Sequence, residues 1–158
     1  MRLSKEAALE KAKHYCAYQE RSHQEVRDKL YSLGLFKADV EEVLSNLISS
    51  SFLDEERFAI QFASGKFRIK NWGRIKIRHA LKMKQVSDFN IRKALDLIDQ
   101  REYEAILGKL ASRKFDSLRN EPYPLRRGKT SQYLLQKGFE RSAIHTIVEQ
   151  LGPDKPCT

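Results

Sequence analysis

Residues 30–47, LYSLGLFKADVEEVLSNL, show the apolar pattern that decides the fold of this chain. Two later stretches share the pattern: LKMKQVSDFNIRKALDLI (81–98) and LLQKGFERSAIHTIVEQL (134–151). Aligned from their first leucine, the three stretches carry an apolar residue at the same five positions: the first, sixth, eleventh, fifteenth and eighteenth. All fifteen positions are apolar although only 41% of the chain is, so chance would leave more than half of them polar. The sequence therefore contains three copies of one unit of about fifty residues.

The apolar spacing inside a copy is that of an amphipathic helix. Val40, Val43 and Leu47 recur at steps of three and four residues, which places them on one helical face. No stretch shows sustained two-residue alternation, so no strand is expected. Each copy divides into three helices, which we expect near residues 4–19, 22–33, 39–50, 54–69, 73–84, 88–100, 102–116, 125–137 and 141–151.

Capping signals agree with these helices. Ser22 precedes Glu25 by three residues, the spacing of a capping box, and Asp39 with Glu42 predicts a cap for the third helix. Gly34 and Gly138 stand where a helix must end, and glycine readily takes the left-handed conformation that closes a helix.

The predicted fold is all-α, with three tandem three-helix repeats forming an elongated, curved helical array. The repeats cover residues 1–53, 54–101 and 102–151, followed by a flexible tail at 152–158. A three-helix unit of this size buries little surface alone, so neighbouring repeats are expected to pack on one another.

The three repeats differ in net charge. The 158 residues hold 30 Lys and Arg against 21 Asp and Glu, a net charge of +9 that indicates a polyanionic partner. The first repeat is neutral, residues 54–101 carry +6 and residues 102–158 carry +3. From Gly65 to Lys84 eight basic residues follow one another without an acidic residue, so we place the binding surface there.

Two clusters make up this predicted surface. The first lies around the fifth helix and comprises Lys66, Arg68, Lys70, Trp72, Arg74, Lys76, Arg78 and Lys82. Because Arg74, Arg78 and Lys82 fall four residues apart, we expect them to share one solvent-facing flank. The second, smaller cluster occupies the matching place in the third repeat and comprises Arg126, Arg127 and Lys129. The alternatives are a solvated basic face without a partner and a Trp72 that packs between helices instead of stacking on a base.

The sequence lacks the motifs that mark common enzyme active sites. The sequence has no glycine-rich phosphate loop and no G-x-S-x-G, and its four histidines lack zinc-site spacing, so we expect no catalytic residue, no metal and no cofactor. Asp54-Glu55-Glu56 is interpreted as the capped first turn of a helix. Cys16 and Cys157 lie far apart in the sequence, which favours a reducing compartment over a disulfide framework. The sequence has no signal core and no apolar run approaching roughly 20 residues. These features favour a cytoplasmic protein without a membrane span.

Several ordered motifs resemble the RecX regulators of bacterial recombination, from about Ala7 to Leu151. The most specific are Arg21-Ser22-x-x-Glu25-Val26-x-x-Lys29-Leu30, Leu53-Asp54-Glu55-Glu56-Arg57-Phe58-Ala59, Gly73-Arg74-x-x-Ile77, Leu81-x-x-Lys84 and Leu134-x-x-Lys137-Gly138-Phe139. One position departs from the family pattern, because Gln85 stands where the family usually has a glycine after the fifth helix.

The resemblance implies a non-enzymatic, monomeric modulator of the RecA recombinase. Such proteins bind the RecA–DNA filament in its helical groove or at its growing end and commonly inhibit its ATP hydrolysis, strand exchange and co-protease activity, although some stimulate. The abundance of Lys and Arg without a base-reading motif predicts weak, non-specific binding to single- or double-stranded DNA. The residues themselves leave a second hypothesis open: a DNA-binding helical-repeat accessory protein that acts on DNA independently of RecA.

Overall fold

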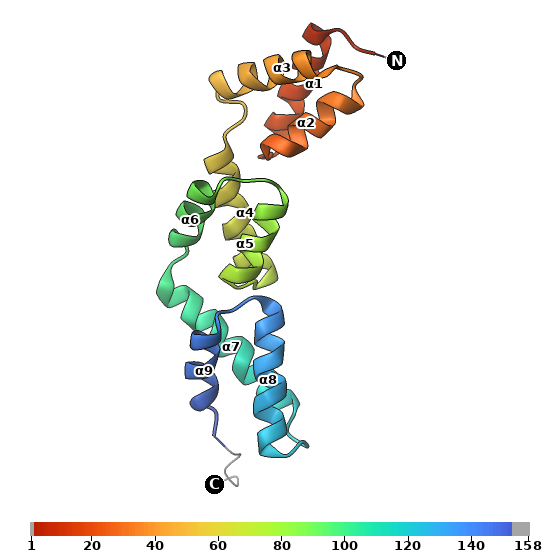
Figure 1. Ribbon diagram of the computed structural model, residues 1–158. Coiled ribbons are helices and arrows are strands. Elements are labelled where there is room, and N and C mark those ends of the chain that lie inside the picture. The colour runs from red at the N-terminus through yellow and green to blue at the C-terminus, as the bar shows by residue number, and fades with distance from the viewer. Residues whose placement is uncertain (1, 153–158) are drawn as a thin grey trace. The chain divides into compact units, whose positions relative to one another are not determined.

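The computed structural model describes residues 2–152, which form nine α-helices and no strand (Figure 1). The all-α prediction is confirmed. The helices are α1 (Lys5–Tyr18), α2 (His23–Ser32), α3 (Lys37–Ser49), α4 (Glu55–Lys70), α5 (Arg74–Met83), α6 (Asp88–Asp96), α7 (Gln100–Ser117), α8 (Tyr123–Lys137) and α9 (Arg141–Glu149).

The repeated apolar positions form the interior of the protein. Fourteen of the fifteen are buried, and Leu151 alone among them is partly exposed. Helical periodicity in the sequence therefore identified the core correctly. Cys16 is also buried, as expected for a small core residue, whereas Cys157 and residues 153–158 of the predicted tail lie outside the described residues.

Several helix boundaries differ from the sequence-based expectation by two to four residues. The helix expected over 88–100 ends at Asp96, and α7 begins at Gln100 because the Asp99 carboxylate accepts a hydrogen bond from the Glu102 amide at 3.0 Å. Helix α8 begins at Tyr123 rather than at residue 125, since Pro124 has a φ that suits a first helical turn.

The expected cap at Asp39 is wrong, whereas two other caps are confirmed. Helix α3 begins at Lys37 after Phe36, which makes no side-chain cap, so Asp39 lies inside the first turn. The Ser22 hydroxyl accepts from the Glu25 amide at 3.1 Å, and the Asp54 carboxylate accepts from the Arg57 amide at 2.9 Å.

The second half of the expected capping box has another role. The Glu25 carboxylate pairs with the Lys84 ammonium at 3.0 Å, which links α2 to the residues that follow α5.

Left-handed residues close the helices where the sequence predicts them. Gly34 has φ +90° and Gly138 has φ +97°, both confirmed as helix-ending glycines. Gln85, which replaces the usual family glycine, adopts φ +60° and closes α5 in the same manner. For a residue other than glycine, this conformation lowers the free energy of unfolding by about 1 kcal/mol.

Replacing Gln85 with glycine is therefore expected to raise the free energy of unfolding by about 1 kcal/mol, because the left-handed turn loses its steric cost. Denaturant titration followed by circular dichroism measures this change. Asn71→Gly is the comparison: Asn71 has φ +57°, but asparagine tolerates this region, so its gain should be smaller. Equal gains at both positions would contradict the argument.

The chain divides into two compact units, each with its own interior. One runs from the N-terminus to Ala63 and includes Ala80–Leu95; the other comprises Ser64–His79 and the residues from Asp96 onward. In the first unit, α1, α2 and α3 pack around Val26, Leu30 and Leu47.

The second unit is built on α7, α8 and α9, which contact one another pairwise. A row of aromatic rings runs through its interior: the Tyr103 centroid lies 5.6 Å from that of Phe67 and 5.2 Å from that of Phe139. No helix formed by residues 2–152 is long and apolar enough to cross a membrane.

Candidate nucleic-acid interface

Trp72 lies at the centre of a group of lysines in the second unit. The chain turns after α4, where the Trp72 amide donates to the Lys66 carbonyl at 3.2 Å. Two ammonium groups approach the partly exposed indole, with Lys66 Nζ 5.0 Å and Lys76 Nζ 4.7 Å from the ring centroid. We call Lys66, Lys70, Trp72, Lys76 and Lys137 the Trp72 cluster.

Lys137 joins the cluster from the end of α8 and was not among the residues singled out in the sequence. Its ammonium donates to the Lys70 carbonyl at 2.8 Å, closing the last turn of α4. Burial, and then the neighbouring charges of Lys76 and Lys70, lower the pKa of Lys137 from its ordinary value. Burial and charge repulsion therefore destabilise the charged form of Lys137, and an anionic ligand would reduce this destabilisation.

Two glycines bring Lys137 to the cluster. The Gly73 amide donates to the Lys137 carbonyl at 2.8 Å, and the Ile75 amide donates to the Gly138 carbonyl at 2.9 Å. A Cβ on Gly73 would lie 2.4 Å from the Gly138 carbonyl carbon, and a Cβ on Gly138 would lie 2.3 Å from the Lys76 Cβ. The turn after α4 and the end of α8 therefore meet backbone to backbone.

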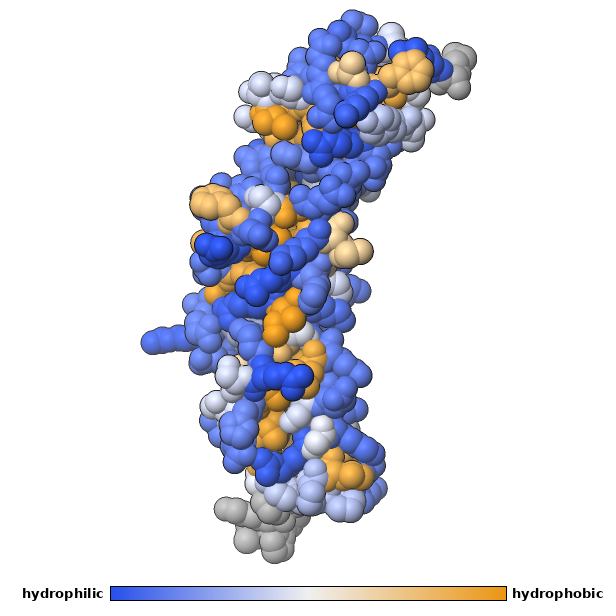
Figure 2. All heavy atoms as spheres, viewed as in Figure 1, coloured by the Kyte–Doolittle hydropathy of each residue, from blue (hydrophilic) through white to orange (hydrophobic). Residues whose placement is uncertain are grey.

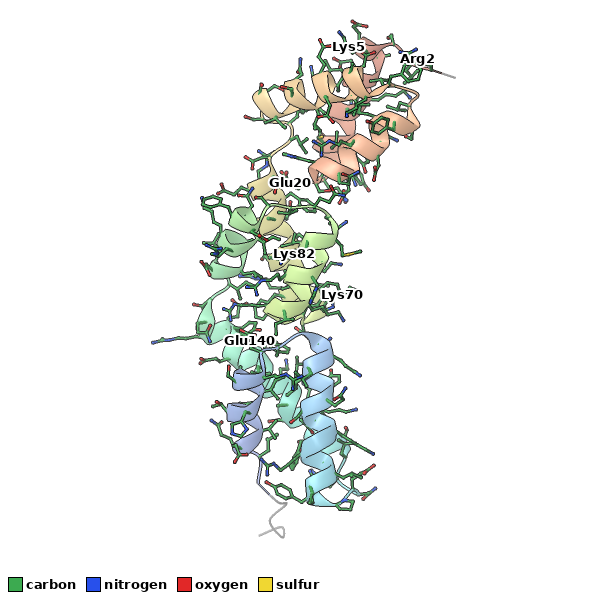
Figure 3. All side chains as sticks on the ribbon, in the orientation of Figure 1. Arg2, Lys5, Glu20, Lys70, Lys82 and Glu140 are labelled. Carbon is green, nitrogen blue, oxygen red and sulfur yellow. The ribbon has the colours of Figure 1, made fainter. Side chains whose placement is uncertain are left out.

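Other predicted residues of the first cluster reach solvent. Arg78 is exposed and has no carboxylate partner among residues 2–152, while Arg68 is exposed and lies 3.6 Å from Glu102. Lys82, which is labelled with Lys70 in Figure 3, belongs to the first unit and lies 3.9 Å from Asp88.

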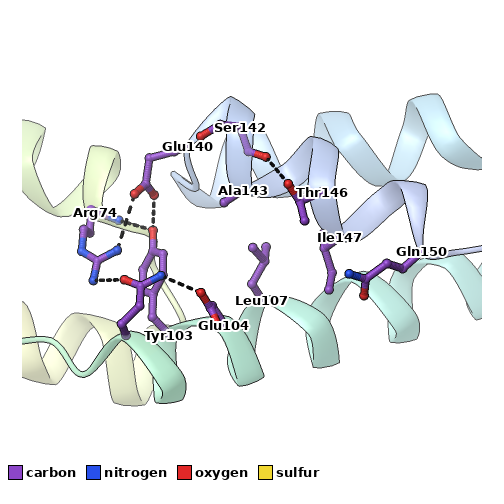
Figure 4. A pocket seen from close by; sticks show the side chains of 11 residues that line it. Arg74, Tyr103, Glu104, Leu107, Glu140, Ser142, Ala143, Thr146, Ile147 and Gln150 are labelled. Carbon is purple, nitrogen blue, oxygen red and sulfur yellow. Dashed lines mark hydrogen bonds and ion pairs between the residues drawn. The ribbon is translucent and has the colours of Figure 1, made fainter.

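Arg74 does not share the solvent-facing flank that its spacing predicts. Its guanidinium lies 3.9 Å from the Tyr103 ring centroid and 3.5 Å from the Glu140 carboxylate, and donates to Gln100 Oε1 at 3.0 Å (Figure 4). Only 19% of its side chain is exposed. The expectation of a free Arg74 is wrong because the first turn of α5 packs against α7 and the loop before α9.

Tyr103 completes this network. Its hydroxyl accepts from the Arg74 amide at 3.0 Å and donates to the Glu140 carboxylate. Burial, and then the hydrogen bond with Glu140, raise the pKa of Tyr103 above its ordinary value, so the phenol stays neutral.

The same residues line one side of a cavity of about 550 Å³ between α7 and α9 (Figure 4). Among the charged residues of this cavity, Arg74 pairs with Glu140, and the Glu104 carboxylate accepts from Gln100 Nε2 at 3.0 Å. No three His, Cys, Asp or Glu side chains in the described part of the chain could hold a metal ion.

The second predicted cluster is occupied by internal contacts. Arg126 is 3% exposed, lies 3.6 Å from the Phe115 ring centroid and donates to the Phe115 carbonyl at 2.9 Å. Arg127 pairs with Glu149, and Lys129 pairs with Glu121 at 2.6 Å. Burial removes Arg126 from a binding surface, and the two carboxylates offset the charge of its neighbours.

Hydrophilic side chains cover most of the face drawn in Figure 2, with apolar atoms showing between them.

Because Arg74 and Arg126 are held by internal contacts and Arg127 and Lys129 are paired with carboxylates, the candidate interface is smaller than the sequence suggests. It consists of the Trp72 cluster with Arg68 and Arg78.

Family models cover nearly the whole helical part of the chain. The model of the RecX first three-helix domain matches residues 8–47, that of the second matches 54–95, and that of the third matches 102–148. The chain belongs to the RecX family. Three tandem three-helix repeats, as the sequence predicts, are the architecture of this family. Its curated members are named regulatory proteins.

Individual RecX proteins are similar along most of this chain. The regulatory protein RecX of Prosthecochloris aestuarii is 32% identical over 146 residues, covering 91% of this chain and 93% of that protein. The RecX of Oceanobacillus iheyensis is 27% identical over 138 residues, covering 87% of this chain and 51% of that protein. The chain thus spans about half the length of some RecX relatives that it matches.

Solved RecX structures share the fold. The crystal structure of RecX from Lactobacillus salivarius superposes with a TM-score of 0.86 at 25% identity, covering 92% of this chain and 95% of that one. A second crystal structure, of regulatory protein RecX, gives a TM-score of 0.84 at 26% identity, covering 92% and 71%.

Proposed function

We propose that this chain is a non-enzymatic, monomeric regulator that binds the RecA–DNA filament in the cytoplasm and inhibits RecA ATP hydrolysis, strand exchange and co-protease activity. Membership of a family of regulatory proteins supports this function. The observation that carries it is the Trp72 cluster, in which Lys66 and Lys76 approach one partly exposed indole and Lys137 lies beside Lys70 and Lys76.

The chemistry of the cluster suits a nucleoprotein filament. Ammonium groups attract phosphates through a long-range field and release the counterions of the nucleic acid on contact. Lys70 and Lys76 make no ion pair with a carboxylate in residues 2–152, so their charge is available to a partner. The part of the indole that is open to solvent can also stack on an exposed base.

The test uses Lys70→Glu/Arg78→Glu, which reverses two exposed charges of the candidate interface. The readout is DNA-dependent ATP turnover by RecA at substoichiometric concentrations of this protein. Half-inhibition by the double variant should need about tenfold more protein than the wild type, because both phosphate attraction and local contacts are lost.

The matched control is Lys109→Glu/Arg113→Glu on α7, in the same unit. These two side chains are also exposed and make no ion pair among the described residues. The control should inhibit within about twofold of the wild type. If both double variants lose inhibition equally, net charge alone acts and the candidate interface is wrong.

The alternative, direct action on DNA without RecA, makes a different stoichiometric prediction. A filament regulator acts well below one molecule per RecA, whereas a DNA competitor needs enough protein to coat the DNA. Inhibition that begins only at coating concentrations would favour the alternative.

A further inference from the structure

A basic cavity lies in the first unit, between α1 and α2, in the repeat whose net charge is zero. Its volume is about 350 Å³, within the range of about 300–1,000 Å³ typical of small-ligand sites. Its walls combine cations with phenol rings, and none of its lining residues is acidic: Lys11, His14, Tyr15, Tyr18, Arg21, Lys29 and Leu33.

One wall of this cavity is held in place by internal contacts. The Arg21 guanidinium lies 3.7 Å from the Tyr15 ring centroid, and Arg21 Nε donates to the Tyr15 carbonyl at 3.1 Å. Lys29 Nζ approaches the same ring at 5.5 Å, and Tyr15 packs against the hydrophobic core. Ring and guanidinium are therefore ordered before any ligand arrives.

The cavity also has charged and aromatic groups that are open to a ligand. Lys11 and Lys29 have no carboxylate partner within residues 2–152, whereas Lys5 and Arg27 of the same unit each pair with a glutamate at 3.0 Å. Tyr18 is 83% exposed, and the Arg21 guanidinium lies 6.0 Å from its ring centroid. The cavity thus offers two ammonium groups and one open aromatic face.

We propose that this cavity binds one nucleotide unit, with its phosphate between Lys11, Arg21 and Lys29 and its base stacked on Tyr18. Cations without a counter-charge select an anion, and an exposed ring beside them selects a planar group attached to that anion. The ligand is either a free mononucleotide or a nucleotide within a single strand. The proposal needs no recombinase and is independent of the Trp72 cluster.

Photo-crosslinking to a single-stranded thymidine oligomer carrying 5-iodouracil tests the cavity directly, with the complete chain and without RecA. Irradiation links the base to an aromatic side chain in contact with it, and mass spectrometry locates the adduct. We expect an adduct on Tyr18 that falls at least about tenfold in Lys11→Glu/Lys29→Glu, because the phosphate contacts are lost. The adduct should persist in Lys70→Glu/Arg78→Glu, which separates this proposal from the proposed function.

The matched control is Lys37→Glu/Arg92→Glu, two exposed charges of the same unit without a carboxylate partner in the described chain. It should leave the Tyr18 adduct within about twofold of the wild type. Tyr31, 46% exposed and outside the cavity, is the internal reference and should be labelled weakly. An adduct confined to Trp72, or an equal fall in both double variants, would overturn the proposal.

Affinity measurements then identify the class of ligand. Tyr18→Ala should weaken oligomer binding about five- to tenfold in fluorescence anisotropy, and Tyr18→Phe should retain it, because stacking needs the ring and not the hydroxyl. Competition by thymidine monophosphate supports a free nucleotide, and competition by oligomers alone supports a strand. Equal competition by polyglutamate, or undiminished binding of an abasic oligomer, would show that no base is held and refute the proposal.

Discussion

Gly73→Ala is expected to lower the free energy of unfolding by at least about 3 kcal/mol. The new Cβ would lie 2.4 Å from the Gly138 carbonyl carbon and oxygen and 2.5 Å from the Phe139 nitrogen, all of them backbone atoms. Overpacking commonly costs about 1–3 kcal/mol, and here the separation also weakens the hydrogen bond from Gly73 to the Lys137 carbonyl. Urea titration followed by circular dichroism measures the loss.

Two helical glycines provide the controls for this substitution. Gly65 in α4 and Gly128 in α8 have no atom within 4 Å of an added Cβ. Alanine at either position should raise the free energy of unfolding by about 0.5–1 kcal/mol, because it limits the freedom of the unfolded chain. A Gly73→Ala protein as stable as Gly65→Ala would show that the two backbones can separate without cost.

Arg74→Glu is expected to lower the free energy of unfolding by about 3 kcal/mol, so that the second unit unfolds at a lower denaturant concentration. The substitution breaks the pair with Glu140, leaves the Gln100 side chain without its guanidinium partner, and places two carboxylates together in a partly buried site. Arg78→Glu makes the same charge change one turn later on the same helix, where the side chain is exposed. It should alter stability by no more than about 0.5 kcal/mol.

This pair of variants also separates folding from binding. Arg78→Glu should weaken inhibition of RecA while its thermal midpoint stays near that of the wild type. If Arg74→Glu kept the wild-type midpoint, the network around Tyr103 would have no structural role and Arg74 would return to the candidate interface.

The contrast between Arg74 and Arg78 shows what the sequence can and cannot predict. Apolar periodicity is a local property, so the helices and the buried face of α5, including Ile77 and Leu81, were predicted correctly. The partners of Arg74 are Tyr103 and Glu140, which lie 29 and 66 residues further along the chain. Spacing within one helix carries no information about such contacts.

The same limit applies to the remaining site residues. Arg126 and Lys129 stand at positions that look exposed in a helical pattern, yet their partners Phe115 and Glu121 lie in the preceding helix and the loop after it. Lys137 was missed because its neighbour Lys70 is 67 residues away. A lysine before a helix-ending glycine was the one local signal, and it is equally common in caps without a binding role.

The contact between Gly73 and Gly138 separates what holds the Trp72 cluster from what the cluster recognises. Two main-chain hydrogen bonds and the Lys76 Cβ, an atom that every residue except glycine has, make that junction. It therefore places little constraint on which side chains stand at positions 72, 76 and 137. Substitutions at these three positions can change the charge and the aromatic character of the surface while the turn and the end of α8 stay in register. The candidate interface around Trp72 can therefore diverge between species at small cost to folding.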